Sequence, residues 1–333
     1  MKRYFTGILT QRYQNLELIF VDDGSTDNTE EIAKSFIKEM EDRGIRFIYI
    51  RQNNTGIAAA INQGLSIFTG DFLTWVDSDD ILLPENISKK VEYLQLHPEF
   101  GFAMSGIVVV DESAPEKALY SRMRNKPKGK DTIFEDYILG RNVVWSPGTV
   151  LVRRECFLHA IPTRRIYESK EGQNWQLMLP ISRLFQCGYV EEPLLICIQH
   201  QDSHSRMKRT TKERIQREEN FITLCCETVK GIPGVSENEK KYWNDVIRKS
   251  HYRNIMKIAV DRMQIEEYLK ARKEVLMSGE KLEFRDYFSV LVSKMLYRKA
   301  KYYTKMVLEK TKEMCMNIKG LEVDVENKET IER

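Results

Sequence analysis

The fold of this chain is decided by the stretch Phe72-Leu73-Thr74-Trp75-Val76-Asp77-Ser78-Asp79-Asp80, an apolar run that ends in three carboxylates. Such a run is typical of a buried strand, and its acidic end places these carboxylates together at the rim of a sheet. Like charges at this spacing repel each other, so they favour a site where a divalent cation bridges them. We interpret Asp77 and Asp79 as ligands of a cation, with Asp80 as a helper or a cap.

A second apolar run, residues 16–21, ends in the same way in Asp22-Asp23-Gly24-Ser25. Two strands that end in carboxylates at one rim describe a pocket for a metal ion and its polar ligand. Either cluster alone fits a turn or a helix cap equally well, since Asp, Ser and Gly are common there. The pair of clusters favours the functional interpretation.

The surrounding pattern alternates between strand and helix, which predicts an α/β fold with a βαβ series and a mostly parallel sheet. Residues 114–132 are rich in Lys, Arg and Pro without an apolar period, and we expect a loop there. From residue 208 to about 319, apolar residues recur at helical spacing and predict a helical appendage. The expected helices are 4–13, 28–43, 57–68 and 84–97, and the expected strands are 17–21, 46–50, 72–76, 101–110 and 194–198.

Composition limits the class of protein. The chain has 333 residues, 42% hydrophobic and 30% charged, with a net charge of +3, which does not indicate a nucleic-acid partner. Its six cysteines form no CxxC pair and suggest reduced thiols. Neither an apolar stretch of about 18 residues nor a signal core is present. We therefore expect a cytoplasmic protein.

Three motifs resemble those of family 2 glycosyltransferases, in the right order and at the usual separations. They are Glu17–Thr29, Asn54–Asn62 and the Asp77-Ser78-Asp79-Asp80 metal motif. The resemblance implies a GT-A, Rossmann-like catalytic domain over residues 1–206 and a helical region over 207–333. The family begins with a strand that carries part of the nucleotide pocket, and this chain starts just after it. Either the start is truncated or the protein lacks this strand, and a missing strand at this position would weaken nucleotide binding.

The resemblance also implies roles in donor binding. Asp22 matches the position that binds the uracil edge in enzymes that use uridine-diphosphate sugars, with Asp23 and Ser25 in the turn beside it. Asn54 and Gly56 form another wall of the nucleotide pocket, or only a strand-to-helix turn. One of the carboxylates, Asp77, contacts either the metal or the ribose. The oxygen-rich ligand set favours Mg²⁺ or Mn²⁺.

The acceptor half departs from the family pattern. The family has Glu-Asp before an aromatic residue, and that Asp is the general base, whereas this chain has Gln173 and Asn174 before Trp175. An amide cannot take a proton near neutral pH. Two explanations remain: Glu171 supplies the carboxylate, or transfer is impaired. Glu171 also fits a plain helix-start acid, favoured there by the helix dipole.

A closing element, residues 200–205, resembles the family's His-x-x-Ser-x-Ser motif. It implies that His200 completes the metal shell or contacts the diphosphate, and that Ser203 and Ser205 donate to phosphate oxygens. A single histidine is equally an ordinary surface residue. The segment 145–148, Trp-Ser-Pro-Gly, lines the acceptor side, unless its Trp145 only packs in the core.

The resulting hypothesis is a metal-dependent inverting glycosyltransferase of polysaccharide biosynthesis. It moves a sugar from a nucleotide-sugar donor, most simply a UDP-sugar, to a hydroxyl of a glycan or lipid-linked saccharide. The alternative is a catalytically impaired nucleotide-sugar-binding protein. A nucleotidyltransferase would need a Gly-rich phosphate loop, and a processive polymerase would need membrane spans, and the sequence has neither. The basic, aromatic-rich segment 285–312 either lies on an anionic membrane as a peripheral anchor, or packs on the catalytic domain or on a second copy in a homo-dimer.

Overall fold

The computed structural model describes residues 1–124, 133–144, 146–169, 172–200, 208–262 and 264–278, together with positions 302, 306 and 309. The chain divides into two compact units. The first comprises Met1–Thr210 and Gln216–His251, and the second comprises Thr211–Ile215 and Tyr252–Arg333. The expected division into a catalytic domain over 1–206 and a helical region over 207–333 stays a prediction.

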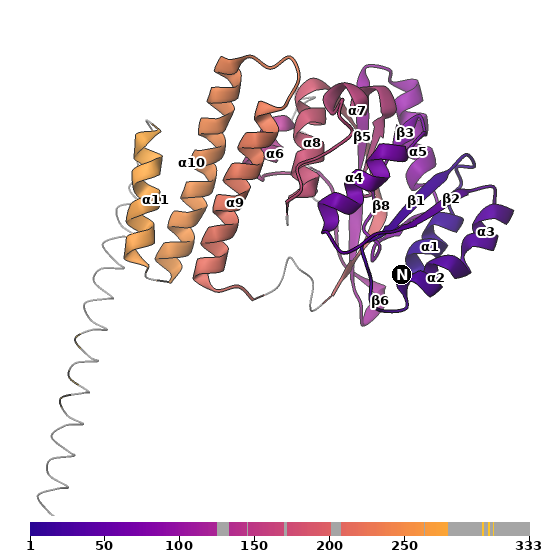
Figure 1. Cartoon of the computed structure of the whole chain (residues 1–333), viewed down its shortest axis with the longest axis horizontal. Helices are drawn as coiled ribbons and strands as arrows, with labels where there is room; N and C mark the ends of the chain where they lie inside the picture. The colour runs from indigo at the N-terminus through magenta and orange to yellow at the C-terminus, as the bar shows by residue number, and fades with distance from the viewer. Residues whose placement is uncertain are drawn as a thin grey trace, which may run out of the picture. The chain divides into compact units, whose positions relative to one another are not determined.

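Alternating helices and strands build the first unit, and this confirms the predicted α/β class (Figure 1). The amino-terminal part consists of α1 (Lys2–Leu9), β1 (Glu17–Asp22), α2 (Thr29–Ser35), α3 (Ile37–Asp42), β2 (Arg46–Arg51) and α4 (Ile57–Ile67). It continues with β3 (Phe72–Leu73), β4 (Ile81–Leu82), α5 (Asn86–Leu96), β5 (Phe100–Asp111), β6 (Ala114–Arg122), α6 (Phe134–Leu139), β7 (Val150–Arg153), α7 (Arg154–Ala160), α8 (Gln173–Leu184) and β8 (Gln186–Gln199).

The strands form two sheets. β1 and β2 make a two-stranded parallel sheet with Asp22 opposite Arg51. The larger sheet has the order β3-β7-β5-β8-β4, with β6 paired to β5. Its β5–β8 pairing is parallel, whereas β3–β7, β5–β7, β4–β8 and β5–β6 are antiparallel. The sheet is therefore mixed, because short strands and a hairpin flank the parallel pair at its centre.

Two local expectations differ from the structure. Residues 114–132 were expected to form a loop, but 114–122 form β6, and this prediction is wrong for that part. β6 pairs only with β5 and is almost wholly exposed, so no apolar alternation marks it in the sequence. The strand expected over 72–76 is regular only at Phe72–Leu73, since β7 pairs with these two residues alone.

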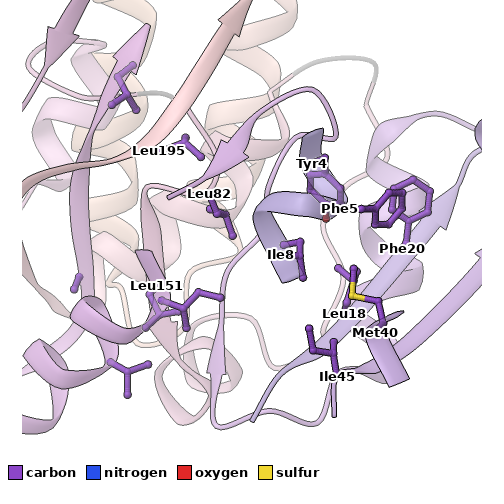
Figure 2. Packing of buried hydrophobic residues seen from close by; sticks show 14 of the residues in the cluster. Tyr4, Phe5, Ile8, Leu18, Phe20, Met40, Ile45, Leu82, Leu151 and Leu195 are labelled. Carbon is purple, nitrogen blue, oxygen red and sulfur yellow. The ribbon is translucent and has the colours of Figure 1, made fainter. Parts of the chain in front are cut away.

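The core around α1 holds the amino-terminal half together (Figure 2). Tyr4, Phe5 and Ile8 recur at helical spacing and are buried, with Phe5 fully enclosed. The Phe5 ring lies 5.2 Å from that of Phe20 on β1. Burying an aromatic side chain of this size stabilises the fold by about 1.5–3 kcal/mol. The helix thus fixes β1, and with it the acidic turn that follows.

The carboxyl-terminal helices are α9 (Thr211–Lys230), α10 (Glu237–Asp261) and α11 (Ile265–Met277). Within the first unit, the ring centroids of Phe221 on α9 and Trp175 on α8 are 4.9 Å apart. Those of Trp243 on α10 and Phe134 on α6 are 5.0 Å apart. The second unit has its own core, which includes Ile255, Met256, Tyr268 and Val275. No helix in the described part of the chain is long and apolar enough to cross a membrane.

Candidate active site

The turn after β1 is built around Asp22. Its carboxylate is buried and accepts hydrogen bonds from the Ser25 backbone at 2.8 Å and the Tyr49 hydroxyl at 2.7 Å, with Arg51 at 3.3 Å. Burial raises the pKa of Asp22, but the bonds from Ser25 and Tyr49 and the Arg51 charge outweigh it, and the pKa lies below its usual range. The structure thus gives Asp22 a turn-stabilising role, and its contact with a nucleobase stays a prediction.

The neighbouring Asp23 joins the first and second motifs. Its carboxylate accepts bonds from the Gln52 side chain at 2.8 Å and from the backbone N–H groups of Thr55 at 2.9 Å and Gly56 at 2.8 Å. Gly24 has φ +74, and a Cβ there would lie 2.7 Å from the Asn54 nitrogen. The structure therefore gathers Asp22, Asp23, Ser25, Asn54 and Gly56 in one cluster, and their role in nucleotide binding stays a prediction.

The acidic motif after β3 folds into a turn that closes with a bond from the Asp80 N–H to the Asp77 carbonyl at 3.0 Å. Asp80 is buried and accepts bonds from the Ser146 hydroxyl at 3.0 Å and the Ile198 N–H at 3.1 Å. Burial, followed by the charge of Asp79, raises the pKa of Asp80 to about 6. Asp80 thus ties the motif to β8 and to the segment around Ser146, and its helper role stays a prediction.

Asp77 and Asp79 remain open to solvent at the same turn. Protein atoms around Asp77, and then the charges of Asp80 and Asp79, raise its pKa above the ordinary range. Asp77 is still exposed to solvent, and hydration of its carboxylate counteracts part of this increase in its pKa. A concentration of negative charge here is the arrangement that a cation relieves.

His200 lies beside this turn. Its Nε2 atom is 3.5 Å from Asp79 Oδ2, and its Nδ1 atom is 2.8 Å from Glu112 Oε2. The Nε2 atom is buried and has no hydrogen-bond partner among the residues that the structure describes. The structure therefore brings together two of the three predicted metal ligands. Among the described residues, no group of three or more His, Cys, Asp or Glu side chains is arranged to hold a metal ion.

Asn174 stands in the first turn of α8, at the position where the family has its general base. Its side-chain oxygen accepts a hydrogen bond from Trp75 Nε1 at 3.0 Å. Trp75 lies two residues before Asp77, so this bond connects α8 to the acidic motif. The amide acts as a hydrogen-bonding group and cannot accept a proton.

Several predicted site residues lie outside the described part of the chain. They are Glu171, Ser203, Ser205 and Trp145, together with the basic segment 285–312 apart from position 302, 306 and 309. Their roles remain predictions.

A hollow of about 720 Å³ lies beside the turn after β1, lined by Ser25, Asp27, Lys34 and Arg51 among others. Of the predicted nucleotide contacts that the structure describes, Ser25 alone lines the hollow, and neither Asp79 nor His200 reaches it. The hollow is open and carries both signs of charge. The acidic motif, rather than this hollow, therefore defines the candidate site.

Sequence reasoning missed four residues that hold the site. Tyr49 and Arg51 bond to Asp22, Trp75 bonds to Asn174, and Glu112 forms an ion-pair contact with His200. Each lies at or beside the end of an expected strand, so the strand pattern marks their region. The partner of each depends on strand order, which the pattern does not give.

Known proteins resemble this chain in sequence. Residues 1–159 match the family model described as Glycosyl transferase family 2. The chain is 31% identical over 185 residues to the putative glycosyltransferase EpsE of Bacillus subtilis, which covers 55% of this chain and 61% of EpsE. It is 44% identical over 88 residues to the glycosyltransferase GlyG of Streptococcus pneumoniae, which covers 26% of this chain and 28% of GlyG. The matches thus span less than two thirds of these relatives.

The fold has a structural neighbour as well. The crystal structure of Staphylococcus aureus TarS 1-349 in complex with UDP-GlcNAc matches with a TM-score of 0.59 at 14% identity, over 89% of this chain and 88% of that one. This likeness confirms the predicted GT-A architecture.

Proposed function

Because residues 1–159 belong to glycosyltransferase family 2, we propose that this chain transfers a sugar from a nucleoside-diphosphate sugar to a hydroxyl group, with inversion at the sugar carbon. The observation that carries the proposal is the approach of His200 to Asp79. These residues lie far apart in the sequence, and their facing atoms are 3.5 Å apart at the end of the central strands. The acceptor is a glycan or a lipid-linked saccharide.

A divalent cation fits this arrangement. Within the described part of the chain, His200 Nε2 is buried without a hydrogen-bond partner, and it lies 3.5 Å from Asp79 Oδ2, too far for a strong hydrogen bond. The two atoms suit a shared divalent cation. Asp79, His200 and Asp77 would hold Mg²⁺ or Mn²⁺. When bound, the ion would neutralise the negative charge that develops on the diphosphate as it leaves the sugar.

The donor is most simply a uridine-diphosphate sugar. The structural neighbour TarS was crystallised with UDP-GlcNAc, which supports this class. The cluster of Asp22, Asp23, Ser25, Asn54 and Gly56 would receive the nucleotide, with Ser203 and Ser205 donating to the phosphates. Tyr49 and Arg51 hold Asp22 ionised and in place in that cluster.

The acceptor hydroxyl must lose a proton as it attacks the sugar. Asn174 cannot take it, because the group is an amide and its oxygen is bonded to Trp75. We assign this role to Glu171, just before α8. Asn174 instead holds Trp75, and through it the strand that leads to Asp77.

The amide of Asn174 at the predicted base position also supports a second candidate function. A chain with an amide at the base position and no substitute carboxylate would bind nucleotide sugar without transferring it. Nucleotide-sugar binding without turnover, for every donor and with the divalent ion present, would favour this alternative.

The test is release of nucleoside diphosphate from a panel of UDP-, GDP- and dTDP-sugars, with Mn²⁺ or with EDTA. Asp79→Asn should abolish the Mn²⁺-dependent release while the melting temperature stays nearly unchanged, because relief of carboxylate repulsion offsets the lost contacts. The matched control is Asp71→Asn, a strongly exposed acid just before β3, which should behave as wild type. Undiminished turnover in Asp79→Asn would remove Asp79 from the site.

A further inference from the structure

The register of the central strands places one more acidic residue at this site. β8 lies between β5 and β4 in the sheet. In the parallel β5–β8 ladder, Asp111 is opposite Gln199, so the next residues along the two strands, Glu112 and His200, emerge side by side. On the other side of β8, the Ile198 N–H donates to Asp80, which brings the acidic motif to the same strand end.

Two hydrogen bonds fix the backbone at Glu112. Its backbone N–H donates to the Gln199 carbonyl at 3.2 Å, which extends the ladder by one residue. The turn that follows is fixed by Asp111, whose carboxylate accepts from the Ser113 N–H at 2.9 Å. Glu112 therefore approaches His200 from a fixed backbone, although its own side chain is largely open to solvent.

The contact between Glu112 and the ring favours one tautomer. His200 Nδ1 lies 2.8 Å from Glu112 Oε2, an ion-pair contact, and since a carboxylate can only accept, we expect the proton of His200 on Nδ1. A neutral ring with that tautomer carries its lone pair on Nε2, the buried atom that faces Asp79 and has no hydrogen-bond partner among the described residues. An imidazole that ligates a metal characteristically gives its other N–H to a carboxylate in this way, which fixes the ring and increases its basicity.

We propose that Glu112 is a positioning residue that fixes the Nδ1–H tautomer and the orientation of His200, so that Nε2 is presented beside Asp79 as a ligand for a divalent cation. This inference rests on the proposed function, because it assumes that Asp79 and His200 share a cation. It adds a residue that lies outside every motif by which the chain resembles its family.

The experiment measures Mn²⁺ binding to the full chain without donor, by electron paramagnetic resonance. Glu112→Ala should weaken Mn²⁺ affinity by about 10–100-fold, the usual effect of removing such a partner. Glu112→Gln should retain affinity close to wild type, because its amide oxygen still accepts the Nδ1 proton. Glu116→Ala, an exposed acid on the adjoining β6, is the matched control and should bind as wild type.

Two further readouts separate positioning from a general structural effect. Adding Glu112→Ala to His200→Ala should cause no further loss of affinity, since Glu112 acts only through the ring. In chain labelled with ¹⁵N-histidine, the His200 shifts should report the Nδ1–H tautomer in wild type. They should lose that preference in Glu112→Ala.

The outcomes distinguish the inference from the function on which it rests. If Asp79→Asn and His200→Ala lose Mn²⁺ affinity while Glu112→Ala binds as wild type, the positioning role is overturned and the metal site stands. If Asp79→Asn and His200→Ala also bind as wild type, both are overturned. An additive loss in the double variant, or an Nε2–H tautomer in wild type, overturns the positioning role alone.

Discussion

Lys90 is a fully buried lysine in the candidate catalytic domain. It lies in α5, and its ammonium donates one hydrogen bond, at 2.7 Å, to the carbonyl of Gly148. Burial lowers the pKa of Lys90 to about 7. Gly148 follows Ser146, which bonds Asp80, so this lysine supports the segment that holds the acidic motif.

This pKa makes stability depend on pH. Between about pH 7 and pH 10 the unfolded chain keeps a proton on Lys90 that the folded chain has released, so the free energy of unfolding rises with pH across that interval. Lys90→Met should remove that rise, so wild type should gain on the order of 2–4 kcal/mol relative to the variant as pH increases. Urea unfolding at a series of pH values measures the difference.

The matched control is Lys89→Met on the same helix, because Lys89 is partly exposed and paired with Glu192 and Glu85. It should leave the rise in place. A difference between wild type and Lys90→Met that does not change with pH would mean that Lys90 stays charged in the fold.

A second prediction at this scale concerns the proton acceptor. Glu171→Gln should lower the rate of sugar transfer by roughly 10²–10⁴-fold, the usual contribution of a general base, with donor affinity preserved. Glu168→Gln is a suitable control, since Glu168 is a half-exposed acid nearby that pairs with Arg165 and accepts a long hydrogen bond from Asn62. Normal transfer by Glu171→Gln would assign the proton to another group.

The sequence predicted site residues where a motif and a strand end coincide. Asp22, Asp23, Asn54 and Gly56 lie together because both turns follow parallel strands in register, and their binding role stays a prediction. The sequence did not predict the hydrogen bonds that the Asp22 carboxylate accepts. Their donors, Tyr49 and Arg51, come from the neighbouring strand. A contact across strands depends on register, and one sequence does not specify it.

At the scale of elements, the start of α8 depends on its packing against α9. Gly172 precedes the helix with φ +85, and a Cβ there would lie 2.8 Å from Leu224 Cδ1. Asn174 follows two residues later and bonds Trp75. The close approach of α9 therefore fixes the helix that carries the acceptor side of the site.

Gly172→Ala should destabilise the fold by about 2–4 kcal/mol, because left-handed strain and overpacking against Leu224 add together. Gly140→Ala is the control, since Gly140 also has a positive φ, +61, but nothing lies within 4 Å of the added Cβ. It should cost only about 1 kcal/mol. Equal losses in urea unfolding would show that the approach of Leu224 contributes nothing.

Elements with a strong apolar period were predictable, and elements shaped by their neighbours were not. The helix over 57–68 and the strand over 46–50 agree closely with α4 and β2. The expected helix over 28–43 is divided at Phe36, whose ring stacks on Phe5 at 4.9 Å. β6 was missed because a strand that pairs on one side and faces water needs no apolar alternation.

At the scale of the whole molecule, the pairing of strands is what the sequence left open. Alternating strands and helices predicted a mostly parallel sheet, and β1–β2 and β5–β8 are parallel. The antiparallel β4 and β7 are short, so their direction leaves no mark on composition. Yet the β5–β8–β4 arrangement is what assembles Glu112, His200 and Asp79.

The basic segment 285–312 can be tested for membrane binding in the full chain. Lysines and arginines interleaved with aromatics bind anionic surfaces, with about 1 kcal/mol for each basic residue near the lipid. Salt-sensitive co-sedimentation with vesicles that contain phosphatidylserine should occur, and it should be lost on deletion of residues 285–333. Absence of binding at low salt would favour packing of this segment on protein.

Anomalous scattering of Mn²⁺ in crystals of the full chain with a nucleoside diphosphate tests most directly whether Asp79 and His200 share a divalent cation. We expect one peak within coordination distance, about 2.0–2.6 Å, of both Asp79 Oδ2 and His200 Nε2, next to the diphosphate. A diphosphate bound without a peak at this position, or a peak that touches neither residue, would contradict it.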